Sequence, residues 1–185
     1  AYAGYSVLLL GEGMCSAAVH GGPELTSAQL FAEAETRFNA VLGGSPSATI
    51  ANLARVGRAR ARLNQGNTAG ALADANAIAA GTRVNAEYAA TGGTRESNRI
   101  ERMNVVGTWI SVEEDFRNLS VYPDGTHGTG SGTPDPRIDV YNANQLGQDQ
   151  TTALWRQRKY TARNTPIRLP SYEEAQLIIA EIELG

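Results

Sequence analysis

Six residues in the second half of the chain have side chains of the types that a carbohydrate site requires. An oligosaccharide presents apolar ring faces beside hydroxyl groups, so its site combines flat aromatic rings with amide, carboxylate and other polar groups. The candidate ligand-binding residues are Trp109, Tyr122, Asp124, His127, Asn144 and Trp155. For the two tryptophans we favour the alternative that they attach this region to the rest of the fold, because a lone tryptophan is usually largely buried.

Catalytic chemistry has less support in the same region. The acidic run Glu113-Glu114-Asp115 could supply the two carboxylates of a glycoside hydrolase, but adjacent side chains diverge, and a solvated surface is favoured. The glycine-rich residues 125–133 lack the Gly-Lys-Ser/Thr ending of a phosphate loop, which favours a flexible loop. Neither histidine accompanies a nucleophile motif. We therefore predict no catalytic residue and no enzymatic activity.

Composition argues against several further kinds of site. The single cysteine, Cys15, cannot form an internal disulfide, and His20 and His127 do not complete a zinc-type ligand set. We expect neither a metal nor a cofactor. The formal net charge of −3, with arginines scattered among acids, provides no basic surface for nucleic acid. The longest apolar run, residues 7–10, is far shorter than the roughly 20 residues that cross a bilayer.

The first 81 residues have helical periodicity. An apolar stripe over residues 5–12 predicts a helix, and Thr26 with Gln29 forms a capping box that predicts the start of another. A third helix is expected from about residue 47 to 65. Gly66 then supplies a left-handed residue, and Asn67 can cap a fourth helix that ends near Ala80.

Small residues dominate the pair of helices expected in residues 51–81. They let helix axes approach closely, which is typical of a tetratricopeptide-type hairpin, although Leu53 and smaller residues replace the large aromatic residues of that repeat. Arg55, Arg58 and Arg62 share one face. They could meet an acidic partner, but we favour an exposed face with internal salt bridges.

Residues 82–170 lose this periodicity and are expected to form an irregular lobe with short helices or strands. Asp135-Pro136-Arg137 predicts a turn in which Arg137 binds a carboxylate or carbonyl across the lobe. Ser171 and Glu174 predict a capping box at a further helix. The expected fold is mainly α, with tetratricopeptide-like hairpins in residues 1–81, an irregular insertion in residues 82–170 and the start of another helix in residues 171–185.

Several segments, in this order, resemble the RagB/SusD family of outer-membrane nutrient-binding lipoproteins. Asp135-Pro136-Arg137, a Lys-Tyr pair, a Pro-Ile pair and a helix ending in Ala-Glu form the more specific part of the resemblance. The segments that carry it are residues 1–15, 59–66, 71–75, 135–137, 157–160, 166–169 and 172–181.

The resemblance implies non-catalytic binding of a nutrient, chiefly an oligosaccharide, at the cell surface. It also implies delivery of this ligand to a SusC-like TonB-dependent transporter, and attachment to the outer membrane by a lipid anchor absent from this chain. Cys15 is not the expected lipidated cysteine, because the residues before it make a poor lipobox. The chain, which begins at Ala1 and not at Met, is then expected to be a processed or truncated piece, roughly the N-terminal half of a member. A tetratricopeptide-type protein interaction domain without a small-molecule ligand stays open as the alternative.

Overall fold

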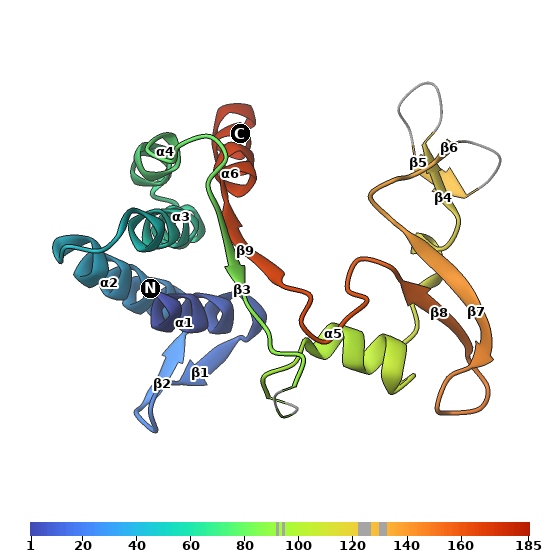
Figure 1. Ribbon diagram of the computed structural model, residues 1–185. Helices are drawn as coiled ribbons and strands as arrows, with labels where there is room; N and C mark the ends of the chain where they lie inside the picture. The colour runs from blue at the N-terminus through green and yellow to red at the C-terminus, as the bar shows by residue number, and fades with distance from the viewer. Residues whose placement is uncertain (92, 94, 122–126, 130–132) are drawn as a thin grey trace. The chain divides into compact units, whose positions relative to one another are not determined.

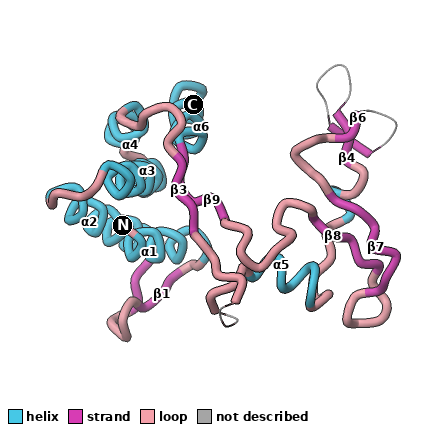
Figure 2. Tube along the Cα trace, viewed as in Figure 1, coloured by secondary structure: helices cyan, strands magenta, loops and turns pink. Residues whose placement is uncertain are grey.

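The computed structural model describes residues 1–91, 93, 95–121, 127–129 and 133–185. The chain divides into two compact units (Figure 1). Unit 1 comprises Ala1–Asn85 and Arg168–Gly185, and unit 2 comprises Ala86–Ile167. Helices dominate unit 1, whereas strands and loops dominate unit 2, as the colours of Figure 2 show.

Unit 1 is built on helices that pack side by side. They are α1 (Tyr2–Gly13), α2 (Ser27–Gly43), α3 (Ala48–Asn64), α4 (Thr68–Asn76) and α6 (Tyr172–Leu184). Helix α1 packs on α2, α2 on α3 and α3 on α4, and α6 packs on both α3 and α4 (Figure 1). The predicted capping box of Thr26 and Gln29 is confirmed, as is the cap by Asn67. Ser171 caps α6 by accepting from the amide of Glu174, which is one half of the predicted capping box. Gly66, with φ of 76°, has the predicted left-handed conformation.

Short antiparallel strands accompany these helices. β1 (Ser16–Ala18) and β2 (Glu24–Thr26) form a hairpin between α1 and α2, in which Ala17 lies opposite Leu25. β3 (Arg83–Ala86) pairs with β9 (Ile167–Ser171), which leads directly into α6. The amide of Tyr172 continues this pairing by donating to the carbonyl of Thr82 at 2.9 Å. The strands therefore fix where α2 and α6 begin.

The aromatic ring of Phe38 lies at the centre of the α1–α2–α3 core. It is fully buried and meets the Tyr5 ring edge to face, with the ring centroids 5.2 Å apart. The Tyr5 hydroxyl donates to the carbonyl of Leu53 at 3.1 Å, and burial raises the pKa of this phenol well above its ordinary value. A Cβ atom on Gly57 would lie 2.3 Å from Phe38 Cζ, and one on Gly4 would lie 2.7 Å from Phe38 Cε1. Glycine is thus required where α1 and α3 approach this ring.

A second apolar cluster joins α3, α4 and α6. Its alanines allow the close approach that the sequence predicts for this region. The cluster contains the buried residues Val56, Ala59, Ala71, Ala75, Ile78, Ala175 and Ile178.

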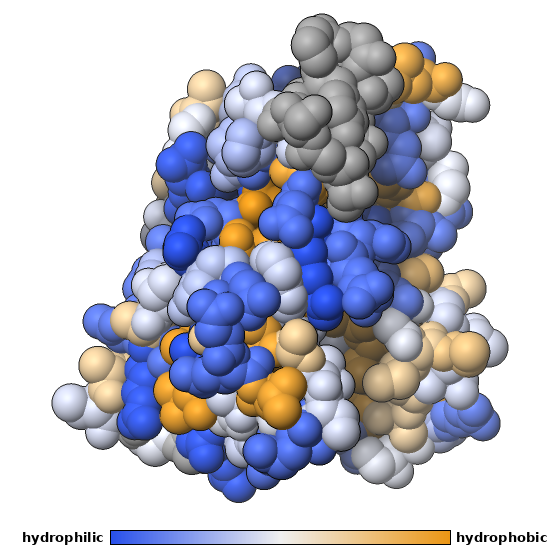
Figure 3. Space-filling view, turned by 90° about the vertical axis from the view of Figure 1, so that its right-hand side faces the viewer, coloured by the Kyte–Doolittle hydropathy of each residue, from blue (hydrophilic) through white to orange (hydrophobic). Residues whose placement is uncertain are grey.

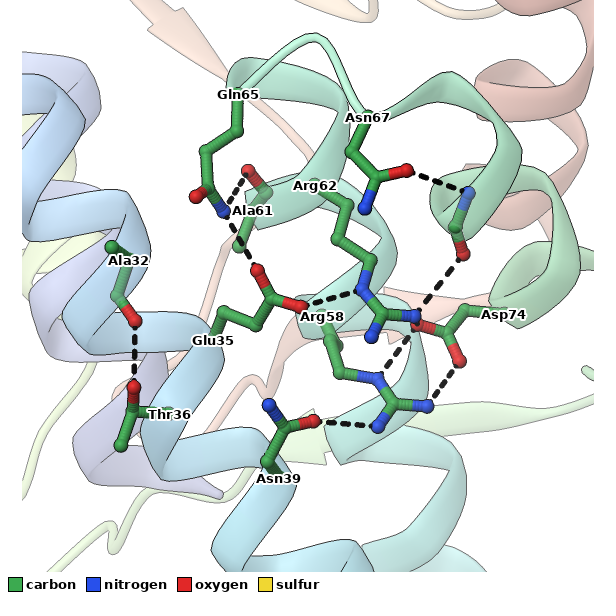
Figure 4. Close-up of polar contacts among 11 residues, drawn as sticks. Ala32, Glu35, Thr36, Asn39, Arg58, Ala61, Arg62, Gln65, Asn67 and Asp74 are labelled. Carbon is green, nitrogen blue, oxygen red and sulfur yellow. Dashed lines mark hydrogen bonds and ion pairs between the residues drawn. The ribbon is translucent and has the colours of Figure 1, made fainter.

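A buried ionic cluster ties α2, α3 and α4 together (Figure 4). Asp74 on α4 has 6% of its side chain exposed and accepts two bonds from Arg58, with Nε–Oδ2 at 2.8 Å and Nη2–Oδ1 at 2.6 Å. Arg62 Nη1 donates to the same carboxylate at 2.9 Å. Both arginines also reach α2: Arg58 bonds Asn39 Oδ1 at 2.7 Å, and Arg62 bonds Glu35 Oε1 at 2.7 Å. The internal salt bridges that the sequence predicts for the arginine face of α3 are therefore present at Arg58 and Arg62, but they are largely buried, not exposed.

Unit 2 consists of short helices and small antiparallel sheets. Its helical turns are α5 (Arg99–Glu101), the π-helical turn η1 (Arg102–Val106) and the 3-10 turn η2 (Glu114–Phe116). Its strands are β4 (Leu119–Val121), β5 (His127–Thr129), β6 (Thr133–Pro134), β7 (Val140–Leu146) and β8 (Ala153–Gln157). β4 pairs with both β5 and β6, and β7 pairs with β8 across an irregularity between Asn142 and Leu146.

The expected fold class, mainly α with tetratricopeptide-like hairpins and an irregular insertion, is therefore wrong. Small antiparallel sheets occur in both units, and the helices of unit 1 have lengths of 12, 17, 17, 9 and 13 residues, so they do not clearly repeat one hairpin. The strands of two to seven residues are too short to give a clear alternating pattern in the sequence, and the longest one contains an irregularity between Asn142 and Leu146.

Side-chain amides take the place of a large apolar core in unit 2. Among its described residues, Leu154 is the one buried hydrophobic side chain. The buried Asn104 donates to the carbonyls of Ile110 and Trp155 at 2.9 and 3.0 Å and accepts from the amide of Gln157 at 3.0 Å. Asn98, also buried, caps α5 and donates to the carbonyl of Thr165 at 2.8 Å. These asparagines join η1, β8 and the segment after β8.

Replacing Gly57 by alanine tests the close approach of α3 to the Phe38 ring. The added methyl group would overlap Phe38 and lie 2.8 Å from Tyr5 Cε2, so Gly57→Ala should lower the free energy of unfolding by about 1–3 kcal/mol in urea denaturation. Gly43→Ala, at the end of α2, meets no atom within 4 Å and should be neutral or stabilising by up to about 1 kcal/mol. Equal effects of the two substitutions would contradict the proposed packing.

Candidate binding site

A hollow of unit 2 lies beside the Asp135-Pro136-Arg137 turn. Its volume is about 740 Å³. Its apolar wall is formed by Leu119, Pro134, Pro136, Ile138 and Val140. Polar groups come from Asn118, Ser120, Asp135, Asp139 and Arg158. These residues belong to β4, β6, the start of β7, the segments next to these strands and the residue after β8, so several separate elements of unit 2 form the hollow.

The carboxylate of Asp135 fixes the turn that borders the hollow. It has no exposed side-chain surface and accepts bonds from the Arg137 amide at 2.9 Å and from Arg137 Nη2 at 2.7 Å. The amide of Asp135 donates to the carbonyl of Leu119 at 2.9 Å, and the amide of Ile138 closes the turn at 3.1 Å. The hydrogen bond to Asp135 raises the pKa of Arg137. The predicted turn is present, but this carboxylate contact of Arg137 is local and does not cross the unit.

An exposed acid–base pair stands at the edge of the hollow. Arg158 Nη1 contacts Asp139 Oδ1 at 3.1 Å, and their side chains are 53% and 57% exposed. The guanidinium carbon of Arg158 also lies 4.4 Å from the centroid of the Tyr141 ring. The backbone holds this arrangement, because the Arg158 amide donates to the carbonyl of Asp139 at 2.9 Å. The pair presents a carboxylate and guanidinium donors to solvent, next to an aromatic ring.

The two tryptophans of the sequence prediction differ in exposure. Trp109 is 49% exposed and borders a small cavity of about 120 Å³ with the loop that joins β7 to β8. Trp155 on β8 is half-buried, and its backbone amide donates to Ser111 Oγ at 2.9 Å. Arg102 and Arg117 lie over the rings of Trp109 and Trp155 at 5.9 and 5.6 Å. Neither ring is fully buried, contrary to the expectation for lone tryptophans.

Of the other four predicted residues, Asn144 has a described side chain, and it does not line the hollow. Asn144 is exposed on β7 in a left-handed conformation, with φ of 52°, and its amide donates to Asn142 Oδ1. Tyr122 and Asp124 lie outside the described residues. His127 belongs to β5, but its side chain is also outside the description. The structure therefore places Trp109, Asn144 and Trp155 around the β7–β8 hairpin, and none of these three lines the hollow.

Sequence reasoning missed Asp139, Tyr141 and Arg158 as site residues. The signal existed, since Asp135-Pro136-Arg137 and residues 157–160 both stood out as motifs. Nothing in their spacing showed that β7 and β8 would bring Asp139 and Arg158 together.

On the face in Figure 3, hydrophobic residues lie in small groups among hydrophilic ones, so the coloured part of this face is chemically mixed.

The described residues give little support for a catalytic acid pair, a metal site or a membrane-spanning helix. Glu113, Glu114 and Asp115 are all exposed. The described parts of the chain contain no group of three or more His, Cys, Asp or Glu side chains placed to hold a metal ion. In the same parts, no helix combines the length and the apolar character needed to cross a membrane.

Comparison with models of known protein families, with curated proteins and with solved structures finds no match to this chain.

Asp149 holds the loop that joins β7 to β8, next to Trp109, and its hydrogen bonds predict how the contribution of this contact depends on pH. Its carboxylate accepts from the Thr152 hydroxyl at 2.5 Å and from the amides of Thr152 and Thr151 at 3.0 and 3.1 Å. These bonds, the Thr152 hydroxyl first, lower the pKa of Asp149. Because the folded-state pKa is depressed, the contribution of this contact is present above the usual aspartate pKa and is lost as pH falls through the folded value.

Thr152→Val should therefore raise the pKa of Asp149 toward the ordinary aspartate value, as followed by NMR titration of its carboxyl carbon. Thr151→Val removes a smaller contribution and should raise it less, because the Thr151 side chain contributes least to the shift. An unchanged pKa in Thr152→Val would show that the hydroxyl bond does not hold this loop.

Proposed function

We propose that this chain is a non-catalytic binding protein for an oligosaccharide, and that the hollow beside Asp135 receives the ligand. The observation that carries the proposal is the composition of that hollow, where proline and aliphatic side chains lie beside the exposed Asp139–Arg158 pair. Its volume of about 740 Å³ falls within the range of roughly 300–1,000 Å³ common for small-molecule sites.

The chemistry of the edge residues fits a sugar. Arg158 can donate several hydrogen bonds and Asp139 can accept several, which matches neighbouring hydroxyl groups that both donate and accept. The Tyr141 ring adds an apolar surface next to these groups. Pro134, Pro136 and Ile138 offer further apolar contacts for the ring faces of a sugar. The proposed contacts are thus spread over polar and apolar groups, as carbohydrate recognition requires.

Binding without hydrolysis is favoured by the state of the two carboxylates in the hollow. Glycoside hydrolysis usually requires one acid that stays protonated to donate to the leaving group, opposite a second carboxylate. Asp135 and Asp139 each have an arginine partner, Arg137 and Arg158, within 3.1 Å. Both carboxylates are therefore engaged by an arginine and do not stand free on opposite sides of a cleft, which favours binding over hydrolysis.

The cellular setting of the proposal rests on sequence motifs alone. We propose, from the resemblance to the RagB/SusD family, that the protein is exposed on the outer membrane and lipid-anchored. There it would pass its ligand to a SusC-like TonB-dependent transporter. The oligosaccharide ligand and this setting can be tested separately, because glycan binding needs only the purified chain.

A glycan array followed by titration calorimetry tests the proposed ligand class. Arg158→Ala should weaken binding of a glycan selected on the array by about tenfold or more, since hydrogen bonds to a charged group are lost. The control is Arg163, which is also an exposed arginine of unit 2 but does not line the hollow. Arg163→Ala should leave the affinity nearly unchanged.

Two results would contradict this proposal. Absence of binding to any glycan on the array would remove carbohydrate as the ligand. Equal loss of affinity in Arg158→Ala and Arg163→Ala would remove the hollow as the binding site.

A further inference from the structure

A groove on unit 1 combines apolar and acidic side chains from three helices. Its volume is about 420 Å³, and α1, α3 and α6 contribute to it. Leu63, Leu177 and Ile178 are its apolar residues, and Glu12, Glu174 and Glu181 are its acids. We call it the α3–α6 groove. It lies entirely within unit 1 and is separate from the hollow described above.

The outward face of α6 continues the apolar part of this groove. Leu177 is 70% exposed and Leu184 is 90% exposed, with the exposed Glu181 between them. Spacings of four and three residues place all three on one side of the helix. The opposite side is already occupied, because Ala175 and Ile178 are buried in the α3–α4–α6 cluster. The α6 helix therefore presents leucines and a carboxylate together to solvent.

The charge of the groove is negative. All four charged residues of α6 are glutamates, and three carboxylates of the groove face a single guanidinium, that of Arg60. Arg60 Nε binds Glu12 Oε1 at 2.6 Å, and its Nη1 contacts Glu174 Oε1 at 3.3 Å. Arg60 therefore joins α1, α3 and α6 beside the groove. Within the described residues, Glu181 and Glu183 make no ion pair.

This combination of residues selects one kind of occupant. Leucines at helical spacing match the apolar stripe of an amphipathic helix that lies in a groove. The surrounding carboxylates match lysine or arginine residues on the flanks of that helix. A second copy of this chain would bring Glu181 and its neighbours against the same acidic residues, and like charges in an interface oppose association.

We propose that the α3–α6 groove binds a basic amphipathic α-helix of a partner protein. The apolar side chains of that helix pack on Leu63 and Leu177, and its basic side chains pair with Glu181. The inference does not depend on glycan binding, because no residue of unit 2 takes part.

A synthetic peptide tests the predicted chemistry with the full chain. The probe is a fluorescein-labelled helix of leucine and lysine, with its leucines at helical spacing, and binding is followed by fluorescence anisotropy at physiological salt. Two control peptides carry the same composition in scrambled order, or glutamate in place of lysine. The basic helix should bind about tenfold or more tightly than either control.

Paired charge reversals on α6 locate the site. Glu181→Lys should weaken binding of the basic helix by about tenfold, whereas Glu183→Lys should change it by less than about threefold, because charges outside the contact are screened by salt. Leu177→Ala should also weaken binding, and circular dichroism checks that the substitution of this side chain, which is 70% exposed, leaves the fold intact.

Four outcomes would overturn the proposal. These are no binding of the basic helix, equal binding of a control peptide, equal effects of Glu181→Lys and Glu183→Lys, and self-association of the chain in sedimentation that Leu177→Ala abolishes. The last result would assign the groove to a second copy of the chain.

Discussion

The buried carboxylate of Asp74 is the interaction on which the helix arrangement of unit 1 depends. A carboxylate removed from water is costly unless cations and hydrogen bonds compensate it, and Arg58 and Arg62 on α3 provide both. Because each arginine also binds a residue of α2, namely Asn39 or Glu35, one charge on α4 sets the position of three helices. The α6 helix then packs on α3 and α4, so the shape of the α3–α6 groove follows from the same cluster.

The two units are stabilised in different ways. In unit 1, small residues let α1 and α3 approach the buried ring of Phe38, and dispersion and hydrophobic burial accumulate over long helices. Unit 2 instead relies on asparagine side chains, such as those of Asn98 and Asn104, which bond several backbone groups each. Such amides fix loops at low cost in apolar area, and they leave Tyr141, Trp109 and their arginine partners at the surface.

Local signals in the sequence predicted local structure well. The capping box of Thr26 and the left-handed Gly66 were recognisable because only neighbouring residues determine them. The sheets were not predictable in the same way, because their strands are short and the longest one, β7, is interrupted by an irregularity between Asn142 and Leu146. The site residues were missed for a related reason: Asp139 and Arg158 are 19 positions apart, and only the β7–β8 pairing joins them. Likewise, three arginines on one helix face gave no indication that Asp74 would be buried between two of them.

Urea denaturation of the native chain and of Asp74→Asn, followed by circular dichroism, tests the central role of the Asp74 cluster. Asparagine keeps the shape of the side chain but leaves the largely buried guanidinium of Arg58 without a carboxylate partner, whereas Arg62 keeps only its ion pair with Glu35. We predict a loss of about 3 kcal/mol in the free energy of unfolding, typical of a broken buried ion pair. A loss below about 1 kcal/mol, as for an exposed salt bridge, would contradict it.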